Sequence, residues 1–188
     1  MLDGPVQESV ELVRTLLADC ASFRTWIHAT GSAASQRLQA FGKIYQIYLD
    51  PPFEVDGYDR DEIRALRPYA SIDLATDEPY VRDAVAAQGD GSEQGMDSGS
   101  IIVEFHENIP TTDVEHPREA VIAFRRVLGA ILDEMIVLSG TSAGPEYVLI
   151  MKYQLFGPIQ VSVDDDDGSV KNDDNMVAIL QVDWGQAR

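Results

Sequence analysis

The chain has 188 residues, 45% of them hydrophobic, which is enough to build the core of one ordinary domain. Its 32 acidic and 14 basic residues give a formal net charge of −18. A surface of that sign repels phosphates, which excludes nucleic-acid binding by counterion release. Cys20 is the single cysteine, so an intrachain disulfide is excluded and we expect a buried thiol in a reducing compartment. No signal-peptide pattern opens the chain and no run approaches the ~18 apolar residues of a membrane span, so we expect a soluble protein without an export signal.

The first fifty residues predict two helices and a strand. Asp3-Gly4-Pro5 favours a helix start, and apolar residues then recur at helical spacing at Val6, Val10, Val13, Leu17 and Cys20. The segment SAASQRLQAF adds a second helical piece that ends at about Phe41. In KIYQIYLD the period changes to two, which predicts a strand that stops at Pro51-Pro52.

The middle of the chain predicts two strands and two polar segments. Residues 53–66 are highly charged, and we expect them to form an acidic loop insertion. The segment RPYASIDLA predicts a strand, and Ser100 to Phe105 predicts another. Between them, residues 75–99 contain a short helical pattern, EPYVRDAVAAQ, followed by GDGSEQGMDSG, so we expect a Gly-rich mobile flap there.

The longest helical pattern lies at residues 117–140. Pro117 suits the first turn of a helix, and Gly140 is placed to close it in a left-handed conformation. Steps of three and four predict one buried apolar stripe, made of Val121, Phe124, Leu128, Ile131, Met135 and Leu138. We expect this helix to be a scaffold of the core without chemistry of its own.

After this helix, residues 147–163 predict a long strand with a bulge or bend at Gly157-Pro158. A polar connection, 164–175, then leads to the partner strand MVAILQVDW. The order helix, three strands, helix, two strands predicts a single α+β domain over residues 1–188, with two main α-helices on one face of a largely antiparallel β-sheet. The spacing between strands favours hairpins over βαβ crossovers.

Two clusters of metal-ligating side chains lack the spacing of a metal site. In DDDDGSVKNDDN, registering Gly168 as the glycine of a calcium loop puts Val163 at the first ligand position, and strands flank the loop. His106, Glu107 and His116 lie close in sequence, but His106 and Glu107 project to opposite faces of a strand. We therefore expect a solvated acidic turn and no metal site.

Motifs for nucleotide binding are missing from the sequence, because no Walker lysine follows a glycine run and GxGxxG does not occur. The pattern GxSxG occurs at residues 140–144, but it follows a predicted helix, whereas a nucleophile elbow joins a strand to a helix. Arg125 and Arg126 lie off the apolar stripe, which predicts a solvated or partner-facing surface. We expect a protein that is not an enzyme, with no catalytic residues and no cofactor.

The order of these elements resembles the tail terminator and related neck proteins of long-tailed bacteriophages. The resemblance covers most of the chain. It rests on the leading helix 6–20, the strands KIYQIYLD, RPYASI and GSIIVEF, the helix REAVIAFRRVLGAILDEM, and the closing hairpin that ends in VDWG.

This resemblance implies a homo-oligomeric ring, a hexamer, that caps the tail tube, ends its polymerisation and gives the head connector a docking surface. The implied partners are the tail tube protein and the head–tail connector or stopper protein, and DNA passes without specific binding. The implied location is the virion tail or neck, after synthesis in the host cytoplasm. The alternatives are another neck component, such as a head–tail joining or stopper protein, and a metal-dependent hydrolase that uses His106, Glu107 and His116.

Six carboxylates gather within eleven residues near the end of the chain: Asp164, Asp165, Asp166, Asp167, Asp173 and Asp174. They repel one another, so folding alone gives no reason to collect them, and a hairpin tip in water tolerates them. Our hypothesis is that they face the DNA channel of the ring, against the alternative of a solvated turn on its outside.

Overall fold

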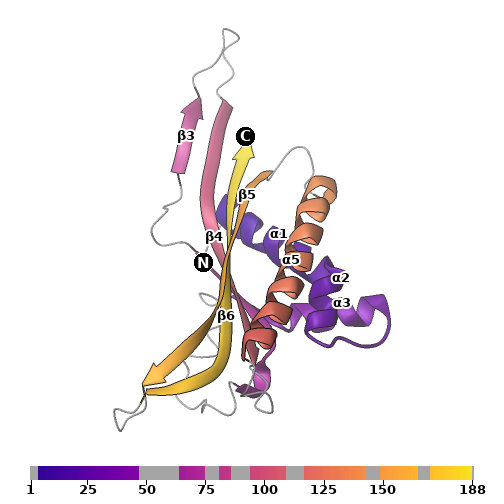
Figure 1. Ribbon diagram of the computed structural model, residues 1–188. Helices are drawn as coiled ribbons and strands as arrows, with labels where there is room; N and C mark the ends of the chain where they lie inside the picture. The colour runs from indigo at the N-terminus through magenta and orange to yellow at the C-terminus, as the bar shows by residue number, and fades with distance from the viewer. Residues whose placement is uncertain are drawn as a thin grey trace.

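The computed structural model describes residues 4–46, 64–74, 81–85, 94–108, 117–142, 149–164 and 170–187. The elements in chain order are α1 (Pro5–Asp19), α2 (Ala21–Trp26), α3 (Ala33–Phe41), β1 (Ile44–Gln46), β2 (Tyr69–Leu74), β3 (Val81–Val85), β4 (Gln94–Asn108), α5 (Pro117–Ser142), β5 (Leu149–Asp164) and β6 (Val170–Ala187). Figure 1 shows the helices together on one side of a long, twisted sheet. The fold is therefore α+β, as the sequence predicts.

The sheet has six strands in the order β1-β2-β4-β6-β5, and β3 pairs with β4 beside this path. All pairings are antiparallel except that of β1 with β2, which is parallel. The sheet is largely antiparallel, as predicted, but the preference for hairpins was wrong for β1 and β2. The segment 47–68 between them is long enough for the crossover connection that parallel strands need.

The strand β4 is the centre of the sheet. One of its edges pairs with β3 over residues 94–98 and with β2 over residues 101–106, and its other edge pairs with β6. In the part of the chain that the structure describes, β6 pairs with β4 only from Asn175 onward. Residues 161–164 and 170–174 therefore form a two-stranded extension of the sheet, which we call the β5–β6 arm. It projects away from the helices (Figure 1).

Several strands are longer than the sequence predicts. Residues 81–85 form β3 instead of the expected helix, and β4 begins at Gln94, inside the predicted flap. The glycine-rich stretch enters the sheet because Gly99 lies opposite Trp184 and leaves room for the indole. The connection between β5 and β6 is also shorter than the predicted segment 164–175, since β5 runs to Asp164 and β6 begins at Val170. Of the predicted acidic loop, residues 64–66 form one helical turn, and 53–63 lie outside the described residues.

The predicted stripe of α5 forms the centre of the core. Phe124, Leu128, Ile131 and Met135 are buried, and Val121 and Leu138 pack against them at the margin. The helix does not end at Gly140 as predicted but continues to Ser142. Helix α1 packs beside it and buries Val10, Val13 and Leu17, and the thiol of Cys20 is buried immediately after its end. Both main helices thus cover one face of the sheet.

Strand β5 has the irregularity that Gly157-Pro158 predicts. The register with β6 shifts between Phe156 and Ile159, and Gly157 has a φ of 93°, which only glycine adopts without strain. The predicted bulge is therefore confirmed. It lies where the sheet passes toward the β5–β6 arm.

Candidate functional site

The six aspartates of the channel hypothesis map to the far end of the β5–β6 arm as far as the structure describes them. Asp164 is the last residue of β5 and pairs with Val170, the first residue of β6. Asp173 and Asp174 lie in β6. The other three, Asp165, Asp166 and Asp167, lie outside the described residues. Strands precede and follow this segment, in contrast to the helices that flank an EF-hand loop.

His106 and Glu107 lie on opposite faces of β4, as the sequence predicts. The His106 ring stacks on Tyr69 with centroids 4.5 Å apart, and its Nε2 lies 3.3 Å from Glu104 Oε2. Glu107 instead faces the helices, where its Oε2 accepts a 2.6 Å hydrogen bond from Trp26 Nε1. His116, the third member of the predicted alternative, lies outside the described residues. Within the described ranges, no three His, Cys, Asp or Glu side chains are grouped to hold a metal ion.

A polar network crosses three strands on the sheet face away from the helices. The Asp183 carboxylate accepts hydrogen bonds from Ser100 Oγ at 2.5 Å and from Gln181 Nε2 at 3.0 Å, and Lys152 Nζ lies 3.8 Å from it. The carboxylate is held by three donors, so this arrangement fixes the strands to one another. No spacing rule predicts this network, because Ser100 and Asp183 are 83 residues apart in the sequence.

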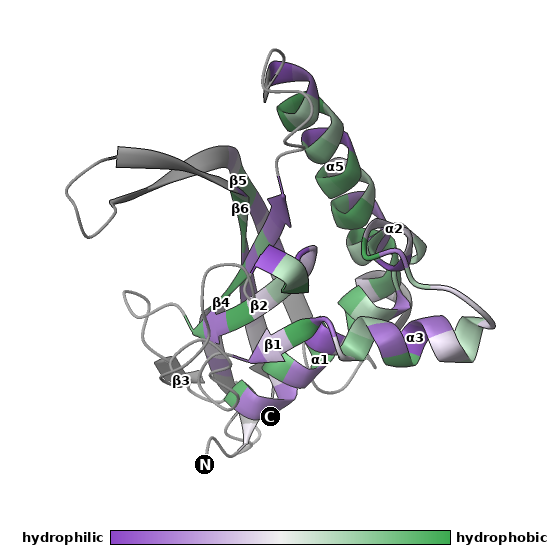
Figure 2. Ribbon diagram, turned by 90° about the horizontal axis from the view of Figure 1, so that it is seen from below, coloured by the Kyte–Doolittle hydropathy of each residue, from purple (hydrophilic) through white to green (hydrophobic). Residues whose placement is uncertain are grey.

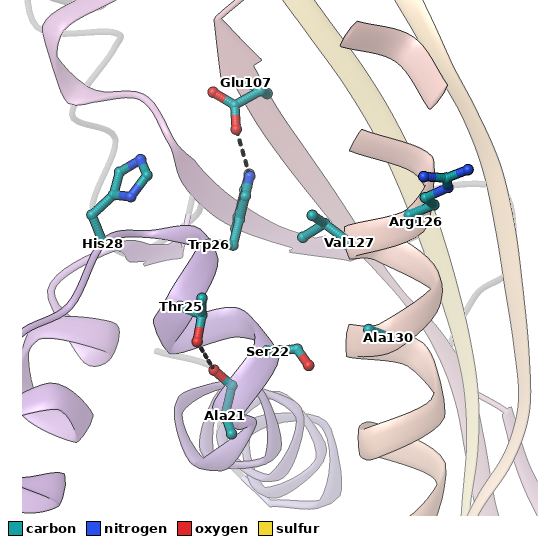
Figure 3. Close-up of a pocket in the computed structure, with 9 residues that line it drawn as sticks. All are labelled: Ala21, Ser22, Thr25, Trp26, His28, Glu107, Arg126, Val127 and Ala130. Carbon is teal, nitrogen blue, oxygen red and sulfur yellow. Dashed lines mark hydrogen bonds between the residues drawn. The ribbon is translucent and has the colours of Figure 1, made fainter. Parts of the chain in front are cut away.

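A groove lies between α2 and α5, with a volume of about 570 Å³. Its lining includes Trp26 from α2, Glu107 from β4, and Val127 and Ala130 from α5. Figure 3 shows the Trp26 indole next to Glu107, with Val127 on one side of it, His28 on the other, and the Arg126 side chain directed away. We call this site the α2–α5 groove.

Two smaller hollows extend the α2–α5 groove. One of about 280 Å³ shares Trp26, Glu107 and Val127 with it and reaches Phe124 and Met176. The other, of about 370 Å³, adjoins it at Ala21. No sequence pattern predicts the groove, because Trp26 and Glu107 are 81 residues apart and each side chain alone has an ordinary core or surface explanation.

Burial raises the pKa of the Glu107 carboxyl above its usual range. Four features oppose this shift in pKa: the hydrogen bond from the Trp26 indole, the backbone N–H of Asn108 at 2.9 Å, and the electrostatic influence of His28 and of Arg67. The result is a carboxylate held in a fixed orientation at the wall of a largely apolar groove. Such a group favours a cation over a second anion.

No protein-family model matches this chain, and no curated protein is significantly similar to it in sequence. Among the described helices, none combines the length and the apolar content required to cross a lipid bilayer. The function of the protein is therefore argued from its residues and their geometry.

Proposed function

We propose that this protein is a ring-forming subunit of the phage tail terminator type, which caps the tail tube and joins it to the head connector. The observation that carries the proposal is the β5–β6 arm. A two-stranded hairpin on its own is marginally stable in water, and this one extends past the end of β4 in the described structure. Contact with the sheet of a neighbouring subunit would stabilise it.

The strand edges at the two ends of the described sheet support assembly in the same way. The strand order places β5 at one end of the sheet and β1 at the other. An unpaired edge is a template for pairing with another chain, and head-to-tail pairing closes into a ring when the rotation between subunits allows it. A hexamer is the ring that the sequence resemblance implies.

The charge of the chain suits a channel for DNA. With a net charge of −18 on each subunit, a ring would surround its channel with a strong negative field. We place the aspartates of the arm on the inner wall, where they would keep phosphates from adhering during genome passage. This role needs binding partners and no catalysis, so the protein is proposed as a structural component of the virion.

The test is the polymerisation of purified tail tube protein in the presence and absence of this chain, with tube lengths measured by negative-stain microscopy. We expect shorter tubes with a ring at one end. A variant in which residues 162–174 are replaced by Asn-Gly keeps the β4-paired part of β6 and is expected to remain monomeric and to lose capping. Replacing the six aspartates by Asn is expected to leave capping intact and to slow genome passage.

Tubes of unchanged length, with no ring at their ends, would contradict the proposal. A chain that binds the head connector but not the tube end would instead be a neck component of the joining or stopper type.

A further inference from the structure

One strip of residues on α5 lines the floor of the α2–α5 groove and of its two extensions. The strip consists of Ala120, Ala123, Val127, Ala130, Glu134 and Val137, which alternate in steps of three and four. This spacing keeps all six on one side of the helix. At 1.5 Å per residue the strip is about 25 Å long. Most of its side chains are small, so another chain can approach the α5 backbone closely.

The opposite wall of the groove also has small side chains. Helix α2 presents Ala21, Ser22 and Thr25 to the groove, and the indole of Trp26 closes its inner end. Figure 2 shows hydrophobic residues along most of α5, with hydrophilic turns between them. Some apolar side chains of this helix remain on its surface, since Ile136 is 48% and Val137 is 67% exposed.

The charges around the groove are mainly negative. Glu107 lies at its inner wall, and the adjoining hollow is lined by Asp19, Asp133 and Glu134. Asp19 is paired with Arg37, and Glu134 accepts a 2.9 Å hydrogen bond from the backbone N–H of Ser22. Asp133 is exposed on α5. Among the described residues that line the groove, the basic side chains are Arg126, which points away, and the exposed His28.

We propose that the α2–α5 groove binds an amphipathic helix of a partner protein, with an apolar stripe on the floor and a lysine or arginine beside Glu107. The two long walls of the groove are α2 and α5, and Glu107 is the one strand residue among the described residues that line it, so a segment that satisfies its own backbone hydrogen bonds fits it best. An apolar ridge of such a helix matches the row of small residues on α5.

The sign of the charge points to a different protein as the partner. A contact between two copies has to overcome the repulsion of two net charges of −18, whereas a basic segment of another protein is attracted to the groove from a distance. This inference does not depend on the ring proposal. Binding in the groove is measured with a peptide, and the ring is measured by particle mass and tube length, so either proposal can fail alone.

The experiment uses the full chain and a fluorescein-labelled synthetic peptide of eighteen residues that forms an amphipathic helix with leucines on one face and lysines beside them. Two comparison peptides have the lysines replaced by glutamates, or the same residues in scrambled order. Fluorescence anisotropy is expected to show binding of the basic amphipathic peptide at least about tenfold tighter than of either comparison peptide, and weaker binding at high salt.

Two variants test the location of the site. Glu107→Gln keeps an oxygen that accepts the Trp26 hydrogen bond but removes the charge, and it is expected to weaken binding about tenfold. Ala130→Arg puts bulk and positive charge at an exposed groove position and is expected to abolish binding. The matched controls are Glu8→Gln at an exposed carboxylate of α1, outside the lining of the groove, and Ile122→Arg on another face of α5, and both are expected to bind as the wild type does. Circular dichroism checks that all four variants fold.

The inference is overturned if the acidic or scrambled peptide binds as tightly as the basic one, or if both groove variants bind like the wild type. It is also overturned if Ala130→Arg dissociates an oligomer that the wild-type chain forms alone, because the occupant would then be a second copy.

Discussion

Gly99 in β4 lies directly opposite Trp184 in β6, and a Cβ at residue 99 would lie 3.1 Å from the indole ring. The indole is only 2% exposed and is part of the core. The glycine therefore makes space for the largest side chain of the sheet, at the point where β4 passes from its pairing with β2 to its pairing with β3.

The first testable consequence compares two glycines. Gly99→Ala is expected to lower the free energy of unfolding by about 1–3 kcal/mol, because the buried indole has to move. Gly129→Ala, inside α5 with no atom within 4 Å of the new Cβ, is expected to raise it by about 0.5–1 kcal/mol, because alanine costs less backbone entropy in a helix. Urea unfolding measures both values. A gain in stability for Gly99→Ala would show that the indole is not tightly held.

The stripe of α5 gives a second expectation. Leu128 is 1% exposed at the centre of the core, so Leu128→Ala should cost about 2–5 kcal/mol of unfolding free energy. Val137 on the same helix is 67% exposed, and Val137→Ala should change the unfolding free energy by less than about 0.5 kcal/mol. Equal effects at the two positions, measured by urea or thermal unfolding, would place Leu128 outside the core.

Cys20 is expected to be chemically inert in the folded protein. Its thiol is buried beside the Ile131 carbonyl, and burial, with a smaller contribution from the charge of Glu134, raises its pKa to about 12. Because the thiolate is the reactive form, alkylation by iodoacetamide at pH 8 should be very slow in buffer and fast in denaturant. Mass spectrometry of timed samples measures the two rates. Similar rates in both conditions would mean that the thiol is accessible.

Glu104 should make the stability depend on pH in the acid range. The hydrogen bond to His106 lowers the pKa of its carboxyl below the ordinary value of 4.5, so the folded state favours the ionised form. Its stabilisation is present above pH 4.5 and is lost as the pH falls through the lowered pKa. Glu104→Gln should therefore destabilise the protein at pH 6 and have little effect at the lowest pH at which the wild type still folds. Urea unfolding across this range measures the difference.

Glu107 should make the stability depend on pH in the opposite direction to Glu104. Burial raises the pKa of its carboxyl, so the folded state binds the proton more tightly than the unfolded state does. Its contribution to stability becomes more favourable as the pH falls through the raised pKa. In the same urea series, the stability of Glu107→Gln relative to the wild type should decrease as the pH is lowered. Parallel pH profiles for the two variants would contradict the assigned environments.

The parts of the fold that the sequence predicted are those with local causes. The spacing of Phe124, Leu128 and Ile131 follows from the helical period, and Gly157-Pro158 interrupts a strand through its own backbone chemistry. Strand β3 was missed because VRDAV does not alternate, and its place is determined by pairing with residues 94–98 of the next strand. The direction of β1 relative to β2 depends on the path of the connection and not on either strand's own residues.

The candidate site was less predictable for the same reason. The sequence suggested Glu107 only as a possible metal ligand. That Glu107 and His106 project to opposite faces of the strand follows from the strand period. Its actual partner, Trp26, comes from a helix 81 residues away, and no spacing rule connects the two. The α2–α5 groove exists only when α2 packs on α5, which is a property of the tertiary structure.

The central claim is that this chain assembles into a ring, and mass photometry of the purified protein with negative-stain imaging of the same sample tests it most directly. We expect particles with six times the 20.7 kDa mass of one chain, seen as rings with a central opening, and single chains for the variant that lacks residues 162–174. A wild-type chain that stays monomeric at every concentration, alone and with tail tube protein, would contradict the claim.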